Sequence, residues 1–439
     1  MVLIEGYSSG SGSSDESIVE EVHAKGSFGS KKRYRFTKQE LKARKQQRKS
    51  NGPWSAWSSD EDNGSGDKED SEAESTTVLE EIIGDDNEEE IGNDYMDETS
   101  NFYGEDGDLS RLLEVPSDLD IDLKKKPLSF KCYLPKRIKY KFSGHSSGTT
   151  CMKFIPNTGH LFLSGGNDNI VKIWDFYHDR KSLRDYRGHT KAIKSMSFND
   201  DAHNFITSSF DQTVKLWDTE TGQVKKRLKF KSTPNCVEFR PANNHEFIVG
   251  LADSKIAHYD TRESSKHGLV QTYDHHLGSI LSLRFFPDGS KFISSSEDKT
   301  VRIWENQINI PIKQISDTTQ YSMPFIGIHP EHKYFCTQSL DNTIYSYSLR
   351  PKYKKHPNKV FKGQKSAGYS IGLSFSPDGR YLLSGDSRSK IVLWDWNTNK
   401  SLKDINIPGK KPITQVAWHP QETSKVLCSG PVGAIYMLD

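Results

Sequence analysis

Cysteine is scarce in this chain, and the few cysteines stand far apart. The 439 residues contain five, Cys132, Cys151, Cys236, Cys336 and Cys428, with no C-x-x-C pair. That spacing excludes a regular disulfide framework and argues for a reducing compartment. Apolar residues make up only 33%, and no run of them approaches the roughly 18 that span a membrane. The opening MVLIEGYSSG lacks the basic start and apolar stretch of a signal peptide. We expect a soluble intracellular protein with no membrane partner.

Catalytic motifs are missing as well. The sequence contains no G-x-x-x-x-G-K-[ST] and no H-E-x-x-H, which argues against phosphate-loop NTPases and zinc proteases. His258, His275 and His276 have no Cys or acid at metal-ligand spacing. We expect no enzyme activity, no cofactor, no metal and no small-molecule substrate.

The net charge of +1 hides a strong asymmetry along the chain. Residues 1–110 hold 27 acids and 12 bases, so the remaining 48 bases and 32 acids leave the rest of the chain at about +16. Within 1–110, a basic block at 31–49 precedes an acidic block at 58–108. Stretches such as EDNGSGDKEDSEAES offer too few apolar groups to offset the entropy of ordering. We interpret 1–110 as a disordered charged tail, followed by an extended lead-in segment at 111–137.

The rest of the chain repeats with a period of 42 to 47 residues. An aromatic residue or its substitute ends one strand of each unit, at Trp174, Trp217, Tyr259, Trp304, Tyr347, Trp394 and Leu438. Such a period, with Gly-His near the start and Trp-Asp at the end, is the WD40 signature, in which each unit is one four-stranded propeller blade. Seven units predict an all-β, seven-bladed WD40 propeller over 138–439.

Three units carry a full set of four polar and aromatic residues at matching positions. A loop His, a strand Ser or Thr, a turn Asp and the strand Trp are predicted to meet as one buried hydrogen-bonded group. The three structural tetrads are His145, Ser164, Asp168 and Trp174; His189, Thr207, Asp211 and Trp217; and His276, Ser294, Asp298 and Trp304. Because the Ser, His and Asp recur at the repeat spacing with a Trp, we interpret them as structural and not as a hydrolytic triad.

The other units depart from this set. Unit three has Asp253 without a matching His, unit five has Thr337 and Asp341, unit six has Gln364 and Arg388 at the His and Asp positions, and unit seven has Val432. Blades built from these units should depend more on packing than on polar networks.

The seventh unit lacks a following segment that would supply its outer strand. The segment Arg137 to His145 has the sequence of such a strand but no unit before it. Because an uncovered edge strand invites aggregation, we predict that strand 138–142 pairs with Gly433 to Leu438 and closes the ring.

Two parts of the tail differ from their surroundings. The basic segment 31–50 contains Thr37 and Glu40 at capping-box spacing, which can start a short helix, and its KKRYR run resembles a nuclear-import signal. The GPW motif at 52–54 is followed by a second tryptophan. Trp54 and Trp57 are candidate partner anchors, with a local cluster of no consequence as the alternative.

A basic stretch in the repeat region is the main candidate for polyanion contacts. The segment Arg350 to Lys365 has seven bases, no acid, and the aromatics Tyr353 and Phe361. The segment is compatible with contacts to nucleic-acid phosphates or acidic protein surfaces. It is equally compatible with a solvated rim that makes no such contacts. The seven candidates are Arg350, Lys352, Lys354, Lys355, Lys359, Lys362 and Lys365.

Several longer stretches resemble one particular family. They are FYGEDGDLSRL, CYLPKR, SGHSSGTTCMKFIPNTGHLFLSGGNDNIVKIWDFY, FKGQKSAGYSIGLSFSPDGRYLLSGD and VAWHPQETSKV. With the charged tail and its GPW, they resemble the WD40 splicing-factor family called pre-mRNA-processing factor seventeen or cell-division-cycle protein forty. The likeness covers about 102–439 and includes loops as well as blade consensus.

This resemblance implies a nuclear, non-catalytic spliceosome component that acts around exon ligation, with spliceosomal proteins as partners and spliceosomal RNA or pre-mRNA as a further candidate. The residues alone reach only a propeller scaffold with a charged tail. A WD40 substrate receptor of a ubiquitin ligase, or a scaffold of another nuclear complex, remains the alternative.

Overall fold

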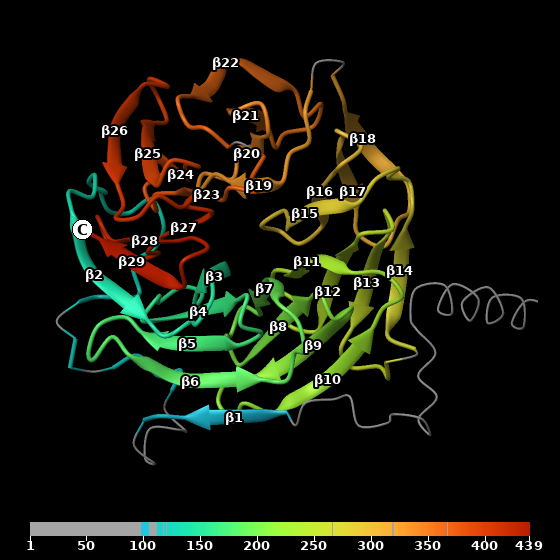
Figure 1. The fold of residues 1–439 in the computed structure, drawn as a ribbon. Helices are drawn as coiled ribbons and strands as arrows, with labels where there is room; N and C mark the ends of the chain where they lie inside the picture. Colours follow the sequence, from blue (N-terminus) through green and yellow to red (C-terminus); the bar gives the residue numbers. More distant parts are fainter. Residues whose placement is uncertain are drawn as a thin grey trace, which may run out of the picture. The chain divides into compact units, whose positions relative to one another are not determined.

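The computed structural model describes residues 98–104, 112–116, 118–119, 121–265, 267–317, 320–366 and 368–439. All of them lie within one compact unit of the chain. The regular elements in this part are β-strands, arranged around a central opening (Figure 1). No helix in the described ranges is long and apolar enough to cross a membrane.

Strands of the described residues form seven antiparallel sheets, the blades, each built mainly from strands consecutive in the sequence. Blades 1 and 2 comprise β3 (Thr149–Phe154), β4 (Leu161–Gly166), β5 (Val171–Asp175) and β6 (Ser182–Arg187), then β7 (Ile193–Phe198), β8 (Asn204–Ser209), β9 (Thr213–Asp218) and β10 (Val224–Lys229). Blades 3 and 4 comprise β11 (Pro234–Phe239), β12 (Glu246–Leu251), β13 (Ile256–Asp260) and β14 (Leu269–Tyr273), then β15 (Ile280–Phe285), β16 (Lys291–Ser296), β17 (Val301–Glu305) and β18 (Pro311–Ile315).

The remaining blades follow the same plan. Blades 5 and 6 comprise β19 (Phe325–Ile328), β20 (Tyr334–Ser339), β21 (Thr343–Ser348) and β22 (Lys355–Lys362), then β23 (Leu373–Phe375), β24 (Tyr381–Gly385), β25 (Lys390–Asp395) and β26 (Ser401–Asn406). Blade 7 comprises β27 (Gln415–Trp418), β28 (Val426–Ser429), β29 (Ala434–Leu438) and the early strand β2 (Ile138–Ser143). The all-β, seven-bladed propeller predicted from the repeat is confirmed for the described residues.

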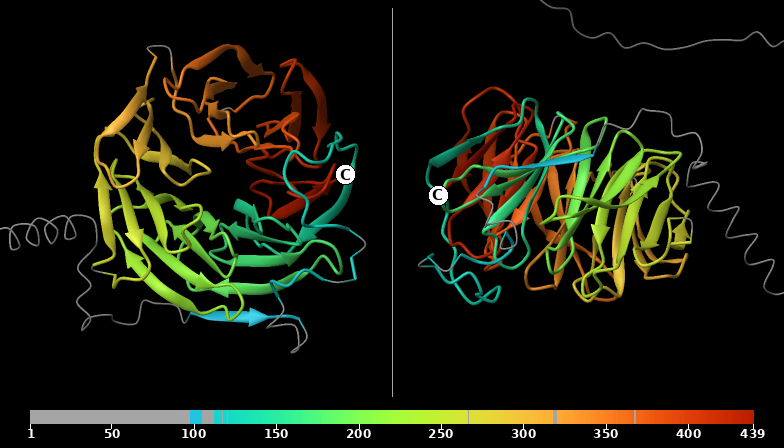
Figure 2. Two further views of the ribbon diagram at one scale, coloured as in Figure 1. Left: turned by 180° about the vertical axis from the view of Figure 1, so that it is seen from behind. Right: turned by 90° about the horizontal axis from the view of Figure 1, so that it is seen from below.

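The first strand of each blade lines the central opening. Each of these strands contacts the first strand of the next blade, in the order β3, β7, β11, β15, β19, β23 and β27, and β27 contacts β3. Successive blades therefore pack face to face around a closed ring, as the views from behind and below show (Figure 2).

The hydrophobic core lies between the blades. Each of the seven apolar clusters joins two neighbouring blades. Strand β12 shows why: Phe247 and Val249 pack toward blade 2, while Ile248 between them packs toward blade 4. Because side chains alternate across a strand, a sheet buried on both faces needs apolar residues at consecutive positions, and every residue of β12 is buried.

The ring closes where β2 pairs with the last strand. Ile138 lies opposite Leu438, and Phe142 lies opposite Ile435. Backbone bonds between Arg137 and Asp439, of 3.0 and 2.9 Å, extend the ladder, and the ammonium of Lys139 lies 2.9 Å from the Asp439 carboxylate. In Figure 1 the C-terminus lies beside β2. The edge left by the seventh unit is thus covered by a segment from nearly 300 residues earlier.

The assignment of all of 1–110 to a disordered tail is wrong at its carboxyl end. Strand β1 (Thr99–Phe102) pairs with β6 and gives blade 1 a fifth strand on its outer edge (Figures 1 and 2). Just before it, Glu98 accepts a 2.6 Å hydrogen bond from Lys215 Nζ, which is only 1% exposed, and pairs with Arg227. The acid count concealed this segment, because the same negative charge that predicts disorder is here the partner of a buried lysine.

The described part of the lead-in segment 111–137 contains no strand, yet it is attached to the blades. Cys132 N donates to Asp378 Oδ2 at 2.8 Å, and its side chain packs in the apolar cluster between blades 6 and 7. Leu112 packs between blades 1 and 2. Gln421 Nε2 donates to the carbonyl of Lys125 at 2.9 Å. The segment therefore belongs to the folded unit although it has no strand of its own.

Candidate functional site

In blade 4 the predicted tetrad forms one continuous hydrogen-bonded chain. His276 Nδ1 lies 2.7 Å from Asp298 Oδ2, and His276 Nε2 lies 2.7 Å from Ser294 Oγ. The Trp304 indole N–H donates to the same Ser294 oxygen at 2.7 Å. Strands β16 and β17 place Ser294 and Trp304, while the connection into the blade places His276 and the β16–β17 turn places Asp298.

Blades 1 and 2 contain the same chain. The distances from histidine Nδ1 to the carboxylate, from Nε2 to the hydroxyl and from the indole nitrogen to the hydroxyl are 2.9, 2.7 and 2.7 Å for His145, Asp168, Ser164 and Trp174. They are 2.8, 2.7 and 2.9 Å for His189, Asp211, Thr207 and Trp217. The structure thus brings together all twelve tetrad residues as the sequence grouped them.

The donors and acceptors of the chain fix its protons. A carboxylate only accepts, so the histidine Nδ1 carries hydrogen, and the neutral Nε2 accepts from the hydroxyl. Burial lowers the pKa of His189 and of His276, which favours this neutral form. Burial opposes the charge of Asp211, but hydrogen bonds from His189 and Thr213 outweigh it and lower its pKa to about 2.

A hydroxyl in this chain is poorly placed for nucleophilic attack. Ser294 is fully buried, and its oxygen already accepts from the Trp304 indole while it donates to His276. A nucleophile needs a free path to its substrate, and the indole takes that place. The arrangement supports a structural role for the tetrads.

Other blades use different polar contacts. In blade 3, the buried His258 Nε2 lies 3.0 Å from Glu246 Oε2, which also accepts from Arg240 at 2.6 Å. Sequence reasoning missed this group because none of its members stands at a tetrad position. In blade 5, Asp341 accepts from the Tyr345 hydroxyl at 2.6 Å. In blade 6, Gln364 is 2% exposed, and both polar atoms of its amide lack a hydrogen-bond partner among the described residues.

The seven basic candidates of Arg350–Lys365 are spread along β22 and the loops at its two ends. Arg350, Lys352 and Lys354 lie in the loop before β22, and Lys362 and Lys365 lie at and beyond its other end. Because β22 bulges between Lys355 and Val360, its eight residues lie opposite only Thr343–Tyr347 of β21, so at about 3.3 Å per residue the strand spans roughly 13 Å between the two groups. All five side chains are exposed.

Lys355 and Lys359 are held by aromatic rings of the propeller itself. The ammonium of Lys355 lies 3.8 Å from the centre of the Tyr345 ring, and that of Lys359 lies 4.0 Å from the centre of the Trp396 ring. The aromatics of this segment, Tyr353 and Phe361, are buried. They alternate with the bases in the sequence but not at the surface, because Tyr353 packs in the apolar cluster between blades 4 and 5 and Phe361 in the one between blades 5 and 6.

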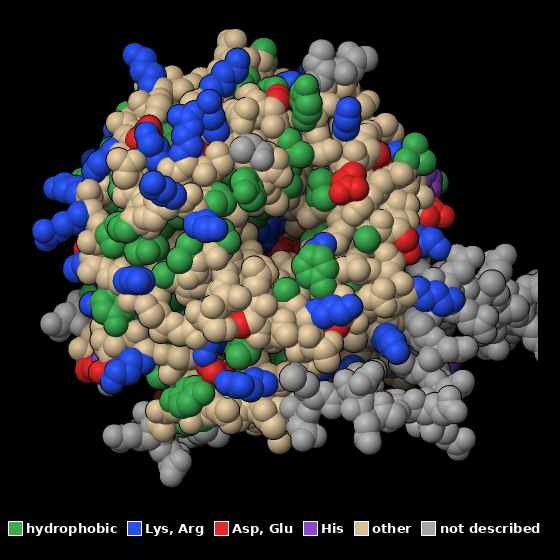
Figure 3. Space-filling model, in the orientation of Figure 1, with side chains coloured by type: hydrophobic (Ala, Val, Ile, Leu, Met, Phe, Trp, Pro, Cys, Tyr) green, Lys and Arg blue, Asp and Glu red, His purple; other side chains and the backbone are tan. Residues whose placement is uncertain are grey.

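Two further sequences rich in Lys and Arg, at 224–231 and 136–141, are partly neutralised, the second through the contact of Lys139 with Asp439. Lys225 pairs with Asp218 at 2.7 Å, and Arg227 pairs with Glu98. Lys136 and Lys141 are exposed. Positive charge is unevenly distributed over the surface. In Figure 3, Lys and Arg side chains gather over the region where Figure 1 labels strands β22, β25 and β26.

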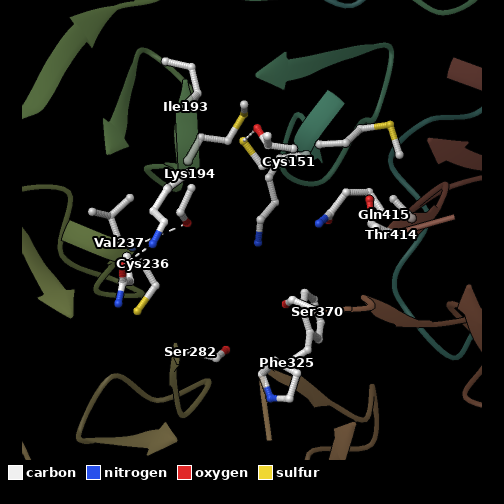
Figure 4. Close-up of a pocket in the computed structure, with 18 of the residues that line it drawn as sticks. Cys151, Ile193, Lys194, Cys236, Val237, Ser282, Phe325, Ser370, Thr414 and Gln415 are labelled. Atoms are coloured by element: carbon white, nitrogen blue, oxygen red, sulfur yellow. Dashed lines mark hydrogen bonds between the residues drawn. The ribbon is translucent and has the colours of Figure 1, made fainter. Parts of the chain in front are cut away.

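The innermost strands enclose a channel with a cavity of about 950 Å³. Figure 4 shows Lys194 and Cys236 on one side of it and Thr414 and Gln415 on the other, with Ser282, Phe325 and Ser370 completing the circle. Blue and red side chains are visible inside the opening in Figure 3. Its charged lining residues are Lys153, Lys194, Glu238, Arg284 and Glu297.

Some predicted features lie outside the described residues. These are the basic segment 31–50, the GPW motif 52–54 and the candidate anchors Trp54 and Trp57. Among the residues that are described, no group of three or more His, Cys, Asp or Glu is arranged to hold a metal ion.

The repeats, the ring of blades and the tetrads define a WD40 β-propeller. The WD40 family pattern (WD domain, G-beta repeat) matches residues 136–175, 180–218, 268–305 and 355–395. A solved structure, the β-propeller domain of Cps50 (Swd1) from Myceliophteria thermophila, superposes with a TM-score of 0.59 over 68% of this chain and 99% of that one. At 17% identity, this likeness shows the fold alone.

Sequence similarity then identifies the family. Pre-mRNA-processing factor 17 of Saccharomyces cerevisiae is 59% identical over 414 residues, which is 93% of this chain and 90% of the relative. The Homo sapiens protein of the same name is 34% identical over 395 residues, 88% of this chain and 67% of the relative. The chain belongs to the pre-mRNA-processing factor 17 family.

Proposed function

We propose that this chain is a nuclear, non-catalytic scaffold of the spliceosome that acts around exon ligation. The observation that carries the proposal is the 59% identity to a pre-mRNA-processing factor, which extends over 93% of the chain and so includes loops and surfaces as well as blade consensus. A closed ring with docked flanking segments suits such a role, because rigid surfaces bind partners with little ordering cost.

RNA that copurifies with the tagged full chain tests the assignment. Small nuclear RNAs and lariat intermediates are expected in the purified material. Copurification of ubiquitin-ligase subunits without these RNAs would favour the substrate-receptor alternative. A more distant relative is named E3 ubiquitin-protein ligase COP1 and is 26% identical over 46% of this chain.

The proposed step has its own test. Splicing extract depleted of this protein should accumulate the products of the first step, the free 5′ exon and the lariat intermediate, and added protein should restore ligated exons. Accumulation of unspliced precursor would instead place the protein earlier.

The exposed bases at the two ends of β22 are the proposed contacts to RNA phosphates or acidic protein surfaces. Lys362→Ser with Lys365→Ser should weaken association with the spliceosome and make the remaining association less sensitive to salt. The matched control is Lys355→Ser with Lys359→Ser, because these ammonium groups lie on Tyr345 and Trp396. Equal losses from both pairs would argue against a direct role for the first pair.

A further inference from the structure

The central channel contains cations without carboxylate partners. Lys153, on β3, has no hydrogen bond or ion pair to its ammonium within the part of the chain that the structure describes. Lys194, on the neighbouring β7, donates to Asn235 Oδ1 and lies over the Phe210 ring, 4.4 Å from its centre. Both lysines are partly buried, and a charge that is partly withdrawn from water is stabilised by an opposite charge.

The channel's own acids compensate these charges only in part. Glu238 is committed to Arg284, with 2.5 Å between Oε1 and Nη1. Glu297 is exposed in the turn between β16 and β17 and forms no ion pair with a described residue. Burial and the nearby Arg284 guanidinium lower the pKa of Lys153 to about 8, and burial likewise lowers the pKa of Lys194. Both shifts disfavour the charged lysine in the absence of a further anion, and the lining still has three bases, Lys153, Lys194 and Arg284, against the two acids.

The walls also offer neutral hydrogen-bond groups. Thr149, Ser282, Ser370, Thr414 and Gln415 line the cavity. Thr149 is only 2% exposed, and its hydroxyl has no hydrogen-bond partner among the described residues. A multivalent anion with many acceptor oxygens matches two ammonium groups and several hydroxyls better than a single carboxylate does.

We propose that the central channel is a binding site for a phosphate-bearing anion, held by the ammonium groups of Lys153 and Lys194. The phosphate belongs either to a small free polyphosphate or to the 5′ end of an RNA strand. The site is separate from the exposed bases of blade 5, and its existence does not depend on the proposed role in splicing.

Inorganic pyrophosphate is the first probe. Calorimetric titration of the full chain at constant ionic strength should show saturable binding, and the thermal unfolding midpoint should rise with pyrophosphate concentration. Lys153→Met and Lys194→Met should each weaken binding about tenfold or more, since a hydrogen bond to a charged group contributes that much. Lys313→Met makes the same charge change on the exposed outer strand of blade 4 and should change the affinity less than about twofold.

The unliganded variant shows whether the loss is specific. Lys153→Met removes a partnerless cation, so its midpoint without pyrophosphate should equal or exceed that of the parent while its response to pyrophosphate disappears. Failure of the parent to bind, or equal weakening by Lys313→Met, would overturn the proposal.

A pair of short RNAs distinguishes the two phosphate sources. If the channel receives an RNA end, a 5′-triphosphorylated oligonucleotide should bind more tightly than its 5′-hydroxyl twin, and Lys153→Met should abolish the difference. If it receives a free anion, the twins should bind equally while pyrophosphate still binds in a manner that requires Lys153. If the oligonucleotide pair shows no preference and pyrophosphate does not bind, the proposed site is refuted.

Discussion

Blades 4 and 6 are built from the same four-stranded pattern, but the polar contacts around their buried tryptophans differ. Blade 4 joins His276, Ser294, Asp298 and Trp304 in one hydrogen-bonded chain. Blade 6 has Gln364 at the histidine position without a partner for its amide, and its Trp394 indole donates instead to the carbonyl of Lys362 at 3.0 Å. Both tryptophans are fully buried. Apolar packing is therefore sufficient to place the tryptophan, and the tetrad adds polar interactions whose partial loss is costly.

The sharpest way to separate the two blades is to replace the residue at the histidine position by leucine. His276→Leu should destabilise the protein by about 3–5 kcal/mol, because Asp298 and Ser294 stay buried after losing their partner. Gln364→Leu should leave stability unchanged or raise it by about 1 kcal/mol, since it removes unpartnered polar atoms. Urea unfolding midpoints measure both, and similar losses would contradict the contrast.

The serine position gives a smaller version of the same test. Ser294→Ala removes the oxygen that both His276 and Trp304 use, so we expect a loss of about 2–3 kcal/mol. Ser384→Ala in blade 6 removes a hydroxyl whose contacts are 3.2 to 3.4 Å long, and should cost less than about 1 kcal/mol. Thermal unfolding of the two variants in parallel would show the difference, and equal midpoints would refute it.

Acid should act first on the tetrad blades. The pKa of His189 is lowered in the folded protein. As pH falls through about 6.5, this histidine therefore takes up a proton in the unfolded chain before it does so in the folded one, and the free energy of unfolding decreases. Asp211, with a pKa lowered to about 2, adds a further loss of about 2–3 kcal/mol as pH falls from about 4 to 2.

Asp211→Asn should flatten this acid limb in unfolding curves measured from pH 5 to pH 2. Asp253→Asn, at the equivalent exposed turn of blade 3, serves as the control and should keep the parent's profile. An unchanged acid limb in Asp211→Asn would show that the tetrad carboxylate does not govern acid stability.

The smallest effect concerns the fifth strand of blade 1, which no other described blade has. Glu98→Gln removes the charge that faces Lys215 and Arg227, and should lower global stability by about 1–2 kcal/mol. Hydrogen exchange should speed up at Thr99–Phe102 more than in β4 and β5. Glu305→Gln, at an exposed strand end, is the matched control, and identical exchange in both variants would argue against the Glu98 contact as an anchor.

Much of the fold and of the tetrads could be predicted because both depend on residues at fixed repeat spacing. The period gives the blades, and the separations of His145, Ser164, Asp168 and Trp174 give the network. What could not be predicted depends on the third dimension. Strand β1 is short and lies in acidic sequence. Glu246 and His258 meet only through the β12–β13 pairing, and the channel charges come from Lys153, Lys194 and Arg284 on three different blades.

The pairing of β2 with β29 has a consequence for how the chain is made. A ribosome that adds about 5–20 residues per second completes β2 roughly 15–60 s before β29, so for that interval β2 has no strand to pair with. Nascent blades 1 to 6 can stack behind it, but the circle stays open. During synthesis this strand is a stretch for chaperones to shield, and a chain cut short inside blade 7 would leave it permanently unsheltered.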